Sequence, residues 1–291
     1  MRRVLLAVIF LLMLSGSTFA GEKRVIRLGL LSKLNSTEEQ FSEAWKKRFA
    51  PRNEQLEVIV KFYDSLTAMQ LALEAGDIMQ MVLPQASAEY VLNQNSKYES
   101  VLVLDAPNMG LAFGFREDSR ELRDKFNEAL KELRDNWILQ SIEGVYTASV
   151  GISGEPEPIE FEKFDGAEAI KVAVTGDLPP IDYVAADGTP AGYNAAVLAE
   201  ISSYLKRPIK LVNVDAGART SSLVSGRSDV VFWYEVNTSA TEQEDVPEGV
   251  ILSDAYYRWN KFVHIRKAPE GRKSGSIWNF KRDILGIYDR W

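Results

Sequence analysis

The chain has 291 residues, of which 34 are Lys or Arg and 41 are Asp or Glu, so its formal net charge at pH 7 is −7. The absence of cysteine and the single histidine exclude a disulfide framework and a multi-histidine metal site. An acidic chain with no basic stripe is also not expected to bind nucleic acid.

The N-terminus predicts a cleaved signal peptide over residues 1–20. A positively charged start precedes an apolar run of about eleven residues at 4–14, which is too short to span a bilayer. Thr18 and Ala20 supply the small residues of a cleavage site before Gly21. Since no cysteine is present to carry a lipid, the mature chain is expected to be free in the periplasm.

The remaining length of about 271 residues exceeds one ordinary hydrophobic core, which favours two lobes. In the first half, apolar runs typical of strands alternate with segments typical of helices. Strands are expected at 25–31, 56–62 and 79–83, and helices from residue 36, at 66–74 and at 86–92. Ser65 and Gly76 are the expected caps of the helix at 66–74. Such alternation predicts an α/β fold with open, mainly parallel sheets flanked by helices.

A second set of alternating strands and helices is expected after a connecting segment. Residues 116–148 alternate acids and bases at helical spacing, which predicts a helical segment with a solvated face, and 149–168 contain the Pro and Gly residues of a linker. Downstream, strands are expected at 171–174, 209–214 and 229–234, and helices at 195–205 and 220–225. Ligands of such folds lie at the carboxyl ends of strands, so a site is expected near 31–37, 83–87, 175–183 and 233–241.

Several segments resemble the bacterial extracellular solute-binding proteins of family 3, the periplasmic amino-acid receptors of ABC importers. Segments similar to the family's first lobe lie in the second half of this chain, at 179–183, 187–188, 192–194, 198–201, 223–229 and 252–257. Segments similar to its second lobe and return crossover lie in the first half, at 63–66, 71–76, 88–92 and 111–118. The resemblance implies a two-lobed, type II-like periplasmic-binding-protein fold with a two-crossover hinge.

Because the lobes resemble the family in reversed order, a circular permutation through the linker is the simplest interpretation. A tandem fragment that needs a missing partner is the alternative. The permuted order makes 21–115 the lobe similar to the family's second, 116–148 a helical segment packed on the other lobe, 169–257 the lobe similar to its first, and 258–291 a hinge strand and C-terminal tail. The hinges are expected at 109–116 and 259–266.

In the family, an arginine binds the ligand carboxylate and a carboxylate of the other lobe binds its ammonium group, since each charge needs a partner once desolvated. At the matching positions this chain has Thr241 and Pro84. The candidate ligand-binding residues are instead polar and aromatic: Asn35, Ser36, Thr37, Gln85, Tyr183, Tyr193, Asn194, Trp233, Tyr234, Glu235 and Thr238. Core packing of the aromatic residues and helix capping at 35–37 are the structural alternatives.

The resemblance, together with the expected signal peptide and cleft, implies a periplasmic solute-binding protein that captures a small polar ligand, an amino acid or a related compound, and delivers it to an ABC-type importer. The expected partners are that ligand and a membrane permease or sensor, and the protein is expected to be monomeric without cofactor or metal. Two alternatives stay open. One is a ligand-sensing or interaction module without a transport role, and the other is a dehydratase-like enzyme using Glu235 or Asp182 as acid or base.

Overall fold

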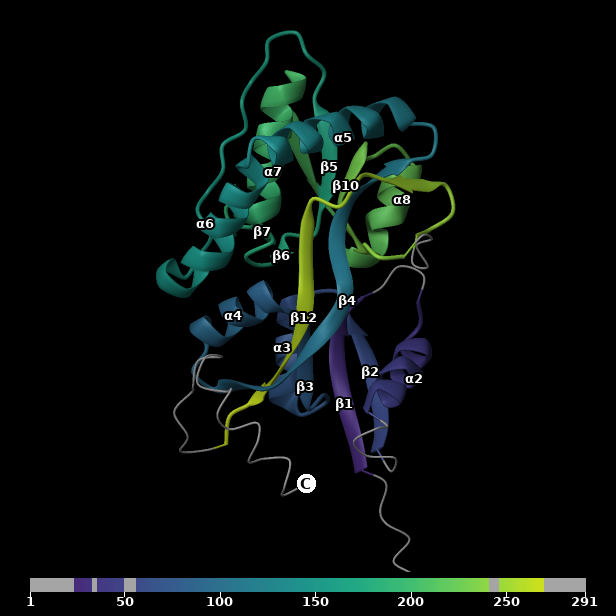
Figure 1. Ribbon diagram of the computed structural model, residues 1–291, viewed down its shortest axis with the longest axis vertical. Helices are drawn as coiled ribbons and strands as arrows, with labels where there is room; N and C mark the ends of the chain where they lie inside the picture. The colour runs from purple at the N-terminus through teal and green to yellow at the C-terminus, as the bar shows by residue number, and fades with distance from the viewer. Residues whose placement is uncertain (1–23, 33–35, 50–55, 241–245, 270–291) are drawn as a thin grey trace, which may run out of the picture.

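The structure is a computed structural model that describes residues 24–32, 36–49, 56–240 and 246–269. The expected signal peptide and most of the C-terminal tail lie outside these ranges. Two α/β lobes lie one above the other in Figure 1, and the long strands β4 (Tyr98–Arg116) and β12 (Tyr257–Lys267) run through both. Within the described ranges, no helix combines the length and apolar character needed to cross a membrane.

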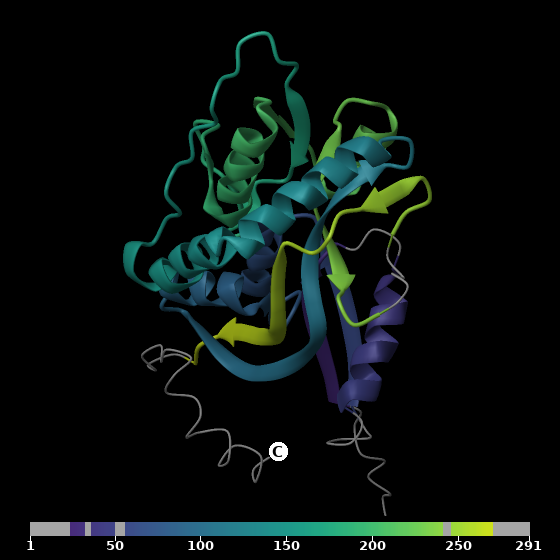
Figure 2. The same ribbon diagram turned by 45° about the horizontal axis from the view of Figure 1, so that its top comes forward.

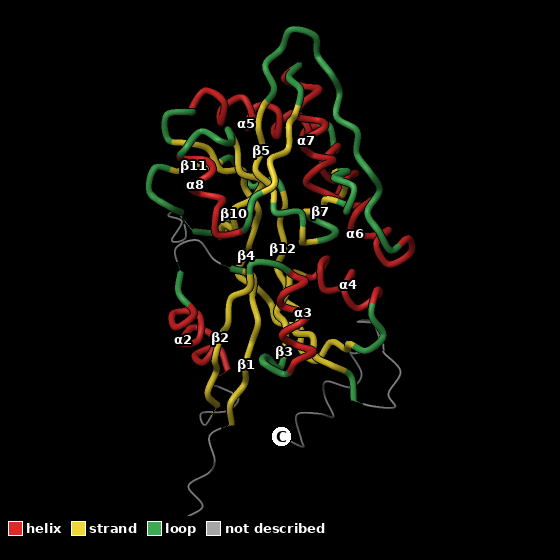
Figure 3. The backbone as a smooth tube through the Cα atoms, turned by 180° about the vertical axis from the view of Figure 1, so that it is seen from behind, coloured by secondary structure: helices red, strands yellow, loops and turns green. Residues whose placement is uncertain are grey.

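The lower lobe contains the N-terminal elements. They are β1 (Arg24–Leu31), α2 (Glu38–Phe49), β2 (Leu56–Tyr63), α3 (Leu66–Ala75), β3 (Gln80–Pro84) and α4 (Gln85–Gln94). β1 pairs in parallel with both β2 and β3. Val82 packs with the side chains of α2, whereas Met81 and Leu83 pack in the core that contains α3 and α4. Figure 3 shows these helices on opposite faces of the strands.

The upper lobe contains the middle of the chain. Its elements are α5 (Arg120–Asp135), α6 (Ile138–Ser153), β5 (Ile170–Val174), β6 (Asp177–Leu178), β7 (Asp182–Val184), β8 (Pro190–Ala191), α7 (Gly192–Leu205), β9 (Ile209–Asn213), the 3₁₀ turn η1 (Ala216–Ala218), α8 (Arg219–Val224), β10 (Val230–Asn237) and β11 (Val250–Leu252). α5 and α6 both contact α7, and Figure 2 shows α5 lying across the upper lobe. α5 buries Phe126, Ala129, Leu130 and Leu133, the spacing of one helical face.

The two lobes share one sheet. Its strand order is β2-β1-β3-β12-β4-β10-β5-β9, with β11 paired to β4 as the ninth strand. Pairing is parallel at both ends of this order, and antiparallel where β12 and β4 join the lobes. The expected two-lobed α/β fold with helix-flanked parallel strands is confirmed, and the crossover strands, which pair with each other and with strands of both lobes, join these strands into one sheet.

The helical segment expected at 116–148 extends further in the structure than the sequence predicts. The linker was expected from residue 149, but α6 continues to Ser153 and ends at Gly154, whose φ of 86° lies in the left-handed region. The glycine at position 151 therefore does not end the helix. By contrast, α3 follows its expected caps, because the Ser65 side chain accepts from the Ala68 backbone and Gly76 adopts a φ of 84°.

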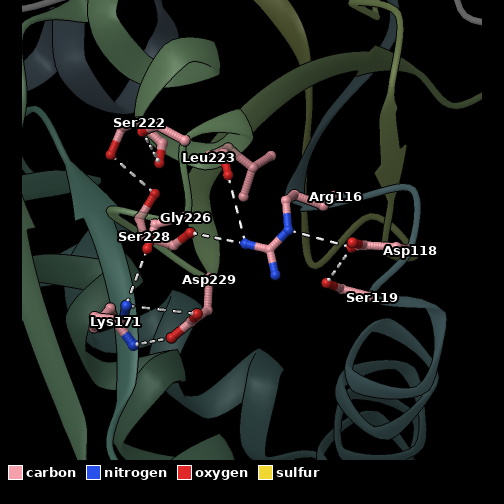
Figure 4. A network of polar contacts seen from close by, with 10 residues as sticks. Arg116, Asp118, Ser119, Lys171, Ser222, Leu223, Gly226, Ser228 and Asp229 are labelled. Atoms are coloured by element: carbon pink, nitrogen blue, oxygen red, sulfur yellow. Dashed lines mark hydrogen bonds and ion pairs between the residues drawn. The ribbon is translucent and has the colours of Figure 1, made fainter.

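Polar contacts fix the crossover strand β4 to the upper lobe (Figure 4). Arg116, at the end of β4, donates hydrogen bonds to the carbonyl oxygens of Leu223 and Ser228, both at 3.5 Å. On β5, which is separated from β4 by β10, Lys171 Nζ donates to the Gly226 carbonyl at 3.0 Å. The turn between α8 and β10 is therefore held by cations from two different strands.

Candidate functional site

A small cavity lies between the lobes, at the carboxyl ends of strands from both. Its lining consists of Leu31, Ser32 and Asp64 from the lower lobe and Thr175, Asp177, Leu178, Ala216 and Arg219 from the upper lobe. Two of the expected loops, 31–37 and 175–183, contribute to it, in agreement with the rule for ligand sites in open α/β sheets. Within this lining one guanidinium lies among two carboxylates, which makes the cavity a candidate site for a charged or polar ligand.

The lower-lobe side is built at the ends of the parallel pair β1 and β2. The Ser32 backbone N–H donates to the Tyr63 carbonyl at 2.9 Å, which extends the ladder one residue past β1. The Ser32 hydroxyl then donates to Asp64 Oδ1 at 2.8 Å. This bond orients the exposed Asp64 carboxylate at the edge of the cavity.

The upper-lobe side depends on a tight turn after β5. Gly176 has a φ of 72°, and a Cβ at this position would lie 2.9 Å from the Val184 Cβ. The turn presents Thr175 and Asp177 to the same cavity. Asp182 anchors it, because its Oδ2 accepts from the Thr175 hydroxyl at 2.7 Å and from its backbone N–H at 3.3 Å. Asp182 is fully buried in this structural role.

Asp177 connects the lobes directly. Its Oδ2 accepts from the Thr67 backbone N–H at 3.2 Å, and its Oδ1 accepts from the Thr67 hydroxyl at 3.3 Å. Thr67 lies in the first turn of α3, where backbone N–H groups have no partner within the helix and the helix dipole favours a negative charge. The upper lobe thus contributes an anion to a helix N-terminus of the lower lobe.

Arg219 is the cation of the cavity lining. It is the first residue of α8, and its side chain is only 3% exposed. Its Nε donates to the Ala216 carbonyl at 3.1 Å, so the guanidinium is held against the 3₁₀ turn that precedes the helix. A guanidinium stays protonated even when buried, and a buried cation is stabilised by an anion and by hydrogen bonds.

The residues predicted before α2 include a helix cap. Thr37 and Gln40 form a reciprocal pair, in which the Thr37 N–H donates to Gln40 Oε1 at 2.8 Å and the Gln40 N–H donates to Thr37 Oγ1 at 3.2 Å. Ser36 is half-buried beside this cap, and Asn35 lies outside the described residues. Thr37 therefore has the structural role named as the alternative to ligand binding.

Two predicted residues lie on either side of the interlobe region. Gln85, at the start of α4, donates from Nε2 to Glu89 Oε1 at 2.8 Å. Tyr183 in β7 is half-buried, and burial together with the nearby Glu155 raises the pKa of its hydroxyl. Neither residue lines the cavity.

Tyr193, Asn194 and Tyr234 are core residues, each no more than 1% exposed. The Tyr193 hydroxyl donates to the Tyr256 carbonyl at 2.8 Å, and Asn194 Oδ1 lies 3.0 Å from the Tyr256 hydroxyl. The Tyr234 ring packs against Gly114, where an added Cβ would lie 2.1 Å from its Cε2. These side chains face the interior of the upper lobe rather than the cavity.

The last predicted group lies in β10 and just after its end. The backbone of Trp233 belongs to this strand, but its side chain lies outside what the structure describes. Glu235 is half-buried. Thr238 donates from both its N–H and its hydroxyl to the Asn108 carbonyl in β4, at 2.7 and 2.8 Å, so it holds the crossover strand.

The described cavity lining thus contains none of the eleven predicted residues. Sequence patterns identified two of the loops but favoured aromatic and amide side chains over Ser32, Asp64, Asp177 and Arg219. Two signals pointed to these residues: Asp64 directly follows the strand ending at Tyr63, and Arg219 begins a helix after a strand. The burial of Arg219 depends on tertiary packing, which the residue pattern does not contain.

Part of the chain matches a known protein family. Residues 170–269 match the family model for bacterial extracellular solute-binding proteins, family 3. A search of curated protein sequences found no match. The matched segment starts at β5 and ends after β12, so it covers the strands of the upper lobe and the second crossover.

Solved structures similar to this chain include a component of an import system, a VFT2 domain and a regulatory domain. The ligand-binding component of an ABC-type import system from Staphylococcus aureus, solved with zinc bound, has 11% identity and a TM-score of 0.43 over 91% of this chain and 71% of that one. The BvgS VFT2 domain of Bordetella pertussis has 14% identity and a TM-score of 0.40 over 92% and 93%. The CcmR regulatory domain of Synechocystis PCC6803, in complex with 2-PG, has 8% identity and a TM-score of 0.38 over 91% and 98%.

The family match is confined to residues 170–269, so it shows that this segment is similar to the bacterial extracellular solute-binding proteins, family 3.

Proposed function

We propose that this protein captures a small polar ligand between its two lobes and delivers it to a membrane partner, an ABC-type importer. The observation that carries this proposal is the interlobe cavity, where Arg219 and Asp64 come from different lobes. A ligand that contacts both lobes stabilises the arrangement in which they are close. Binding would then shift the population between open and closed forms, and a membrane partner would recognise the closed surface.

The secreted location belongs to the same proposal. The charged start, short apolar run and small-residue cleavage site support export to the periplasm, where a receptor meets solutes before they reach the inner membrane. The reversed order of the lobes fits a circular permutation, since the family match begins at residue 170 while β1 begins at Arg24. Permutation leaves the cavity between the same two lobes, so it does not alter the proposed capture.

Thermal unfolding tests the capture step. The mature chain, residues 21–291, would be melted with individual amino acids, amines, short peptides and organic acids at millimolar concentration. A ligand at about 100 times its Kd adds roughly 2.7 kcal/mol to the free energy of unfolding and raises Tm by several degrees. A selective stabiliser that also reduces the radius of gyration in small-angle scattering supports capture between the lobes. Failure of every compound class to change either quantity contradicts it.

A ligand found by thermal unfolding can also be used to distinguish a receptor from an enzyme. A Glu235→Gln variant of a dehydratase-like enzyme would lose turnover and keep ligand affinity, whereas a receptor has no turnover in either form. Product formation from the stabilising ligand, followed by mass spectrometry and lost in this variant, would contradict the proposed role.

A further inference from the structure

We propose that the chain's own C-terminal segment, residues 270–291, docks on the outward face of α6 and ties the lower lobe to the upper lobe. Docking of this segment is independent of whether a ligand is captured between the lobes. Three features point to it: an exposed helix face that is almost without charge, the place where the described chain leaves the lower lobe, and the residue pattern of the segment.

The outward face of α6 lacks the charged residues that normally cover a surface helix. Glu143 is the only charged residue in α6, whereas α5 alternates acids and bases along its length. Trp137, directly before α6, is 72% exposed, and Val145 is 48% exposed. Ser141 and Gly144 are exposed at the same helical spacing, and a Cβ added at Gly144 would meet no atom of the described residues within 4 Å. A helix face of this kind is typical of a surface that another element covers.

The described chain leaves the lower lobe beside one end of this helix. The Ala268 N–H donates to the Lys97 carbonyl at 2.6 Å, shortly after α4 ends at Gln94. Gly154, which ends α6, lies against the same glutamine, since a Cβ added there would be 3.1 Å from Gln94 Nε2. The contact between α4 and α6 therefore brings the start of segment 270–291 close to the C-terminal end of α6 (Figure 1).

The sequence of the segment predicts an amphipathic helix. Five apolar residues recur at alternating spacings of three and four, which places them on one face of a helix: Ile277, Phe280, Ile284, Ile287 and Trp291. A helix over 277–291 would be about 22 Å long, and the 16 residues of α6 span about 24 Å. Residues 270–276 can extend over about 23 Å, which is enough to bring this helix alongside α6.

The charges of the two partners are complementary. Segment 270–291 carries five basic and three acidic residues, and Arg272 and Lys273 lie near its start. The loop 155–168 that follows α6 carries six acidic residues and one lysine. Burial and the nearby Glu157 raise the pKa of Tyr146 in α6, so this loop lies along the helix. The basic start of the segment is thus placed beside an acidic loop, which favours docking at this end of α6.

Docking adds a third crossing of the chain between the lobes. β4 and β12 make the first two, and β12 ends in the lower lobe, whereas α6 belongs to the upper lobe. A segment that starts at the end of β12 and lies antiparallel to α6 limits how far the lobes separate. It also removes the Trp137 indole and its own apolar face from water, which stabilises the docked form.

Thiol labelling of the mature chain tests the docking, because the protein contains no cysteine of its own. Ser141→Cys places a single thiol on the outward face of α6. Adding Ile284→Asp, which puts a charge into the apolar face of the segment, should speed its labelling at least about fivefold, because a covered thiol reacts only when the segment leaves. The matched control is Asn279→Asp, which adds the same charge away from that face and should leave the rate unchanged. Leu71→Cys, at a 66% exposed position on α3, should react at one rate in all three backgrounds.

Disulfide formation identifies the occupant of α6. Under mild oxidation, Ser141→Cys combined with Ile287→Cys or Trp291→Cys should form a bond within one chain, whereas Leu71→Cys combined with the same substitutions should not. An unchanged labelling rate in Ile284→Asp overturns the proposal. So does a disulfide that joins two chains through Ser141→Cys, since a second copy would then cover the helix. A compound that still raises Tm of the wild-type chain in either case leaves the proposed function intact.

Discussion

Removing the hydroxyl of Tyr256 should destabilise the upper lobe without changing ligand affinity. This hydroxyl lies 2.8 Å from the Phe232 carbonyl and 3.0 Å from Asn194 Oδ1, and it has one proton to donate to these two acceptors. The ring is stacked on Phe113 with centroids 4.2 Å apart, so a phenylalanine keeps the packing. Burial raises the pKa of Tyr256 well above its usual value, in keeping with a neutral donor.

The magnitude follows from the acceptors left behind. In Tyr256→Phe the single proton shared by two buried oxygens is lost, and leaving a buried polar group unsatisfied costs about 1–3 kcal/mol. Both acceptors belong to the upper-lobe core, so water can replace the hydroxyl only by entering that core. We therefore expect the free energy of unfolding to fall by about 1–3 kcal/mol and Tm to fall by roughly 2–10 °C.

Urea unfolding followed by circular dichroism would measure this change, with the m-value expected to stay constant. Tyr204→Phe is the matched control, because Tyr204 is 45% exposed and its hydroxyl is available to water; its effect should stay within about 0.5 kcal/mol. A variant that keeps wild-type stability, or that weakens ligand binding as strongly as a cavity variant, would refute the assignment of this tyrosine cluster to the core.

Three further changes test other parts of the structure. Asp177→Asn should weaken the contact with Thr67 by about 1 kcal/mol and increase the radius of gyration in small-angle scattering, and an unchanged profile would show that other contacts hold the lobes. Gly176→Ala should lower the free energy of unfolding by about 1 kcal/mol or more, because a Cβ would meet Val184 at a positive φ, and urea titration would detect it. Burial and the neighbouring Glu74 raise the pKa of Tyr98 to about 12, so stability present below about pH 10 should be lost between pH 10 and 12. Tyr98→Phe should make that decline shallower in alkaline melts.

The sequence predicted those features of the fold that depend on neighbouring residues. The helix α3 begins after Ser65 and ends at Gly76 as expected, because capping and left-handed backbone are local properties. The joined sheet was not predicted, since pairing of β4 with β12 links residues more than a hundred positions apart. The predicted end of α6 was too early. A glycine inside a helix costs only about 1 kcal/mol relative to alanine, and the rest of the helix can offset that cost.

At the candidate site, too, the sequence predicted features that depend on neighbouring residues and missed those that depend on tertiary packing. Hydrophobic periodicity located the strand ends at Leu31 and Thr175, and both residues line the cavity. It did not distinguish an aromatic side chain that faces inward, such as Tyr193, from one that faces a ligand. Arg219 was overlooked because an arginine at the start of a helix is ordinarily solvated, and only the packed structure shows that it is buried.

The irregular pairing of the crossover strands has a mechanical consequence. The pairing of β4 with β12 shifts register twice, between Trp259 and Lys261 and between His264 and Ile265. The larger shift is the first, where Met109 pairs with Trp259 and Asp105 with Lys261, so four steps along one strand match two along the other. Paired β-strands resist stretching and sliding, but they bend more easily where regular pairing is interrupted. This point is therefore expected to be a joint more flexible than the paired segments on either side of it. Thr238 is hydrogen-bonded to Asn108 inside the joint. Any bending at this joint would therefore also displace the end of β10.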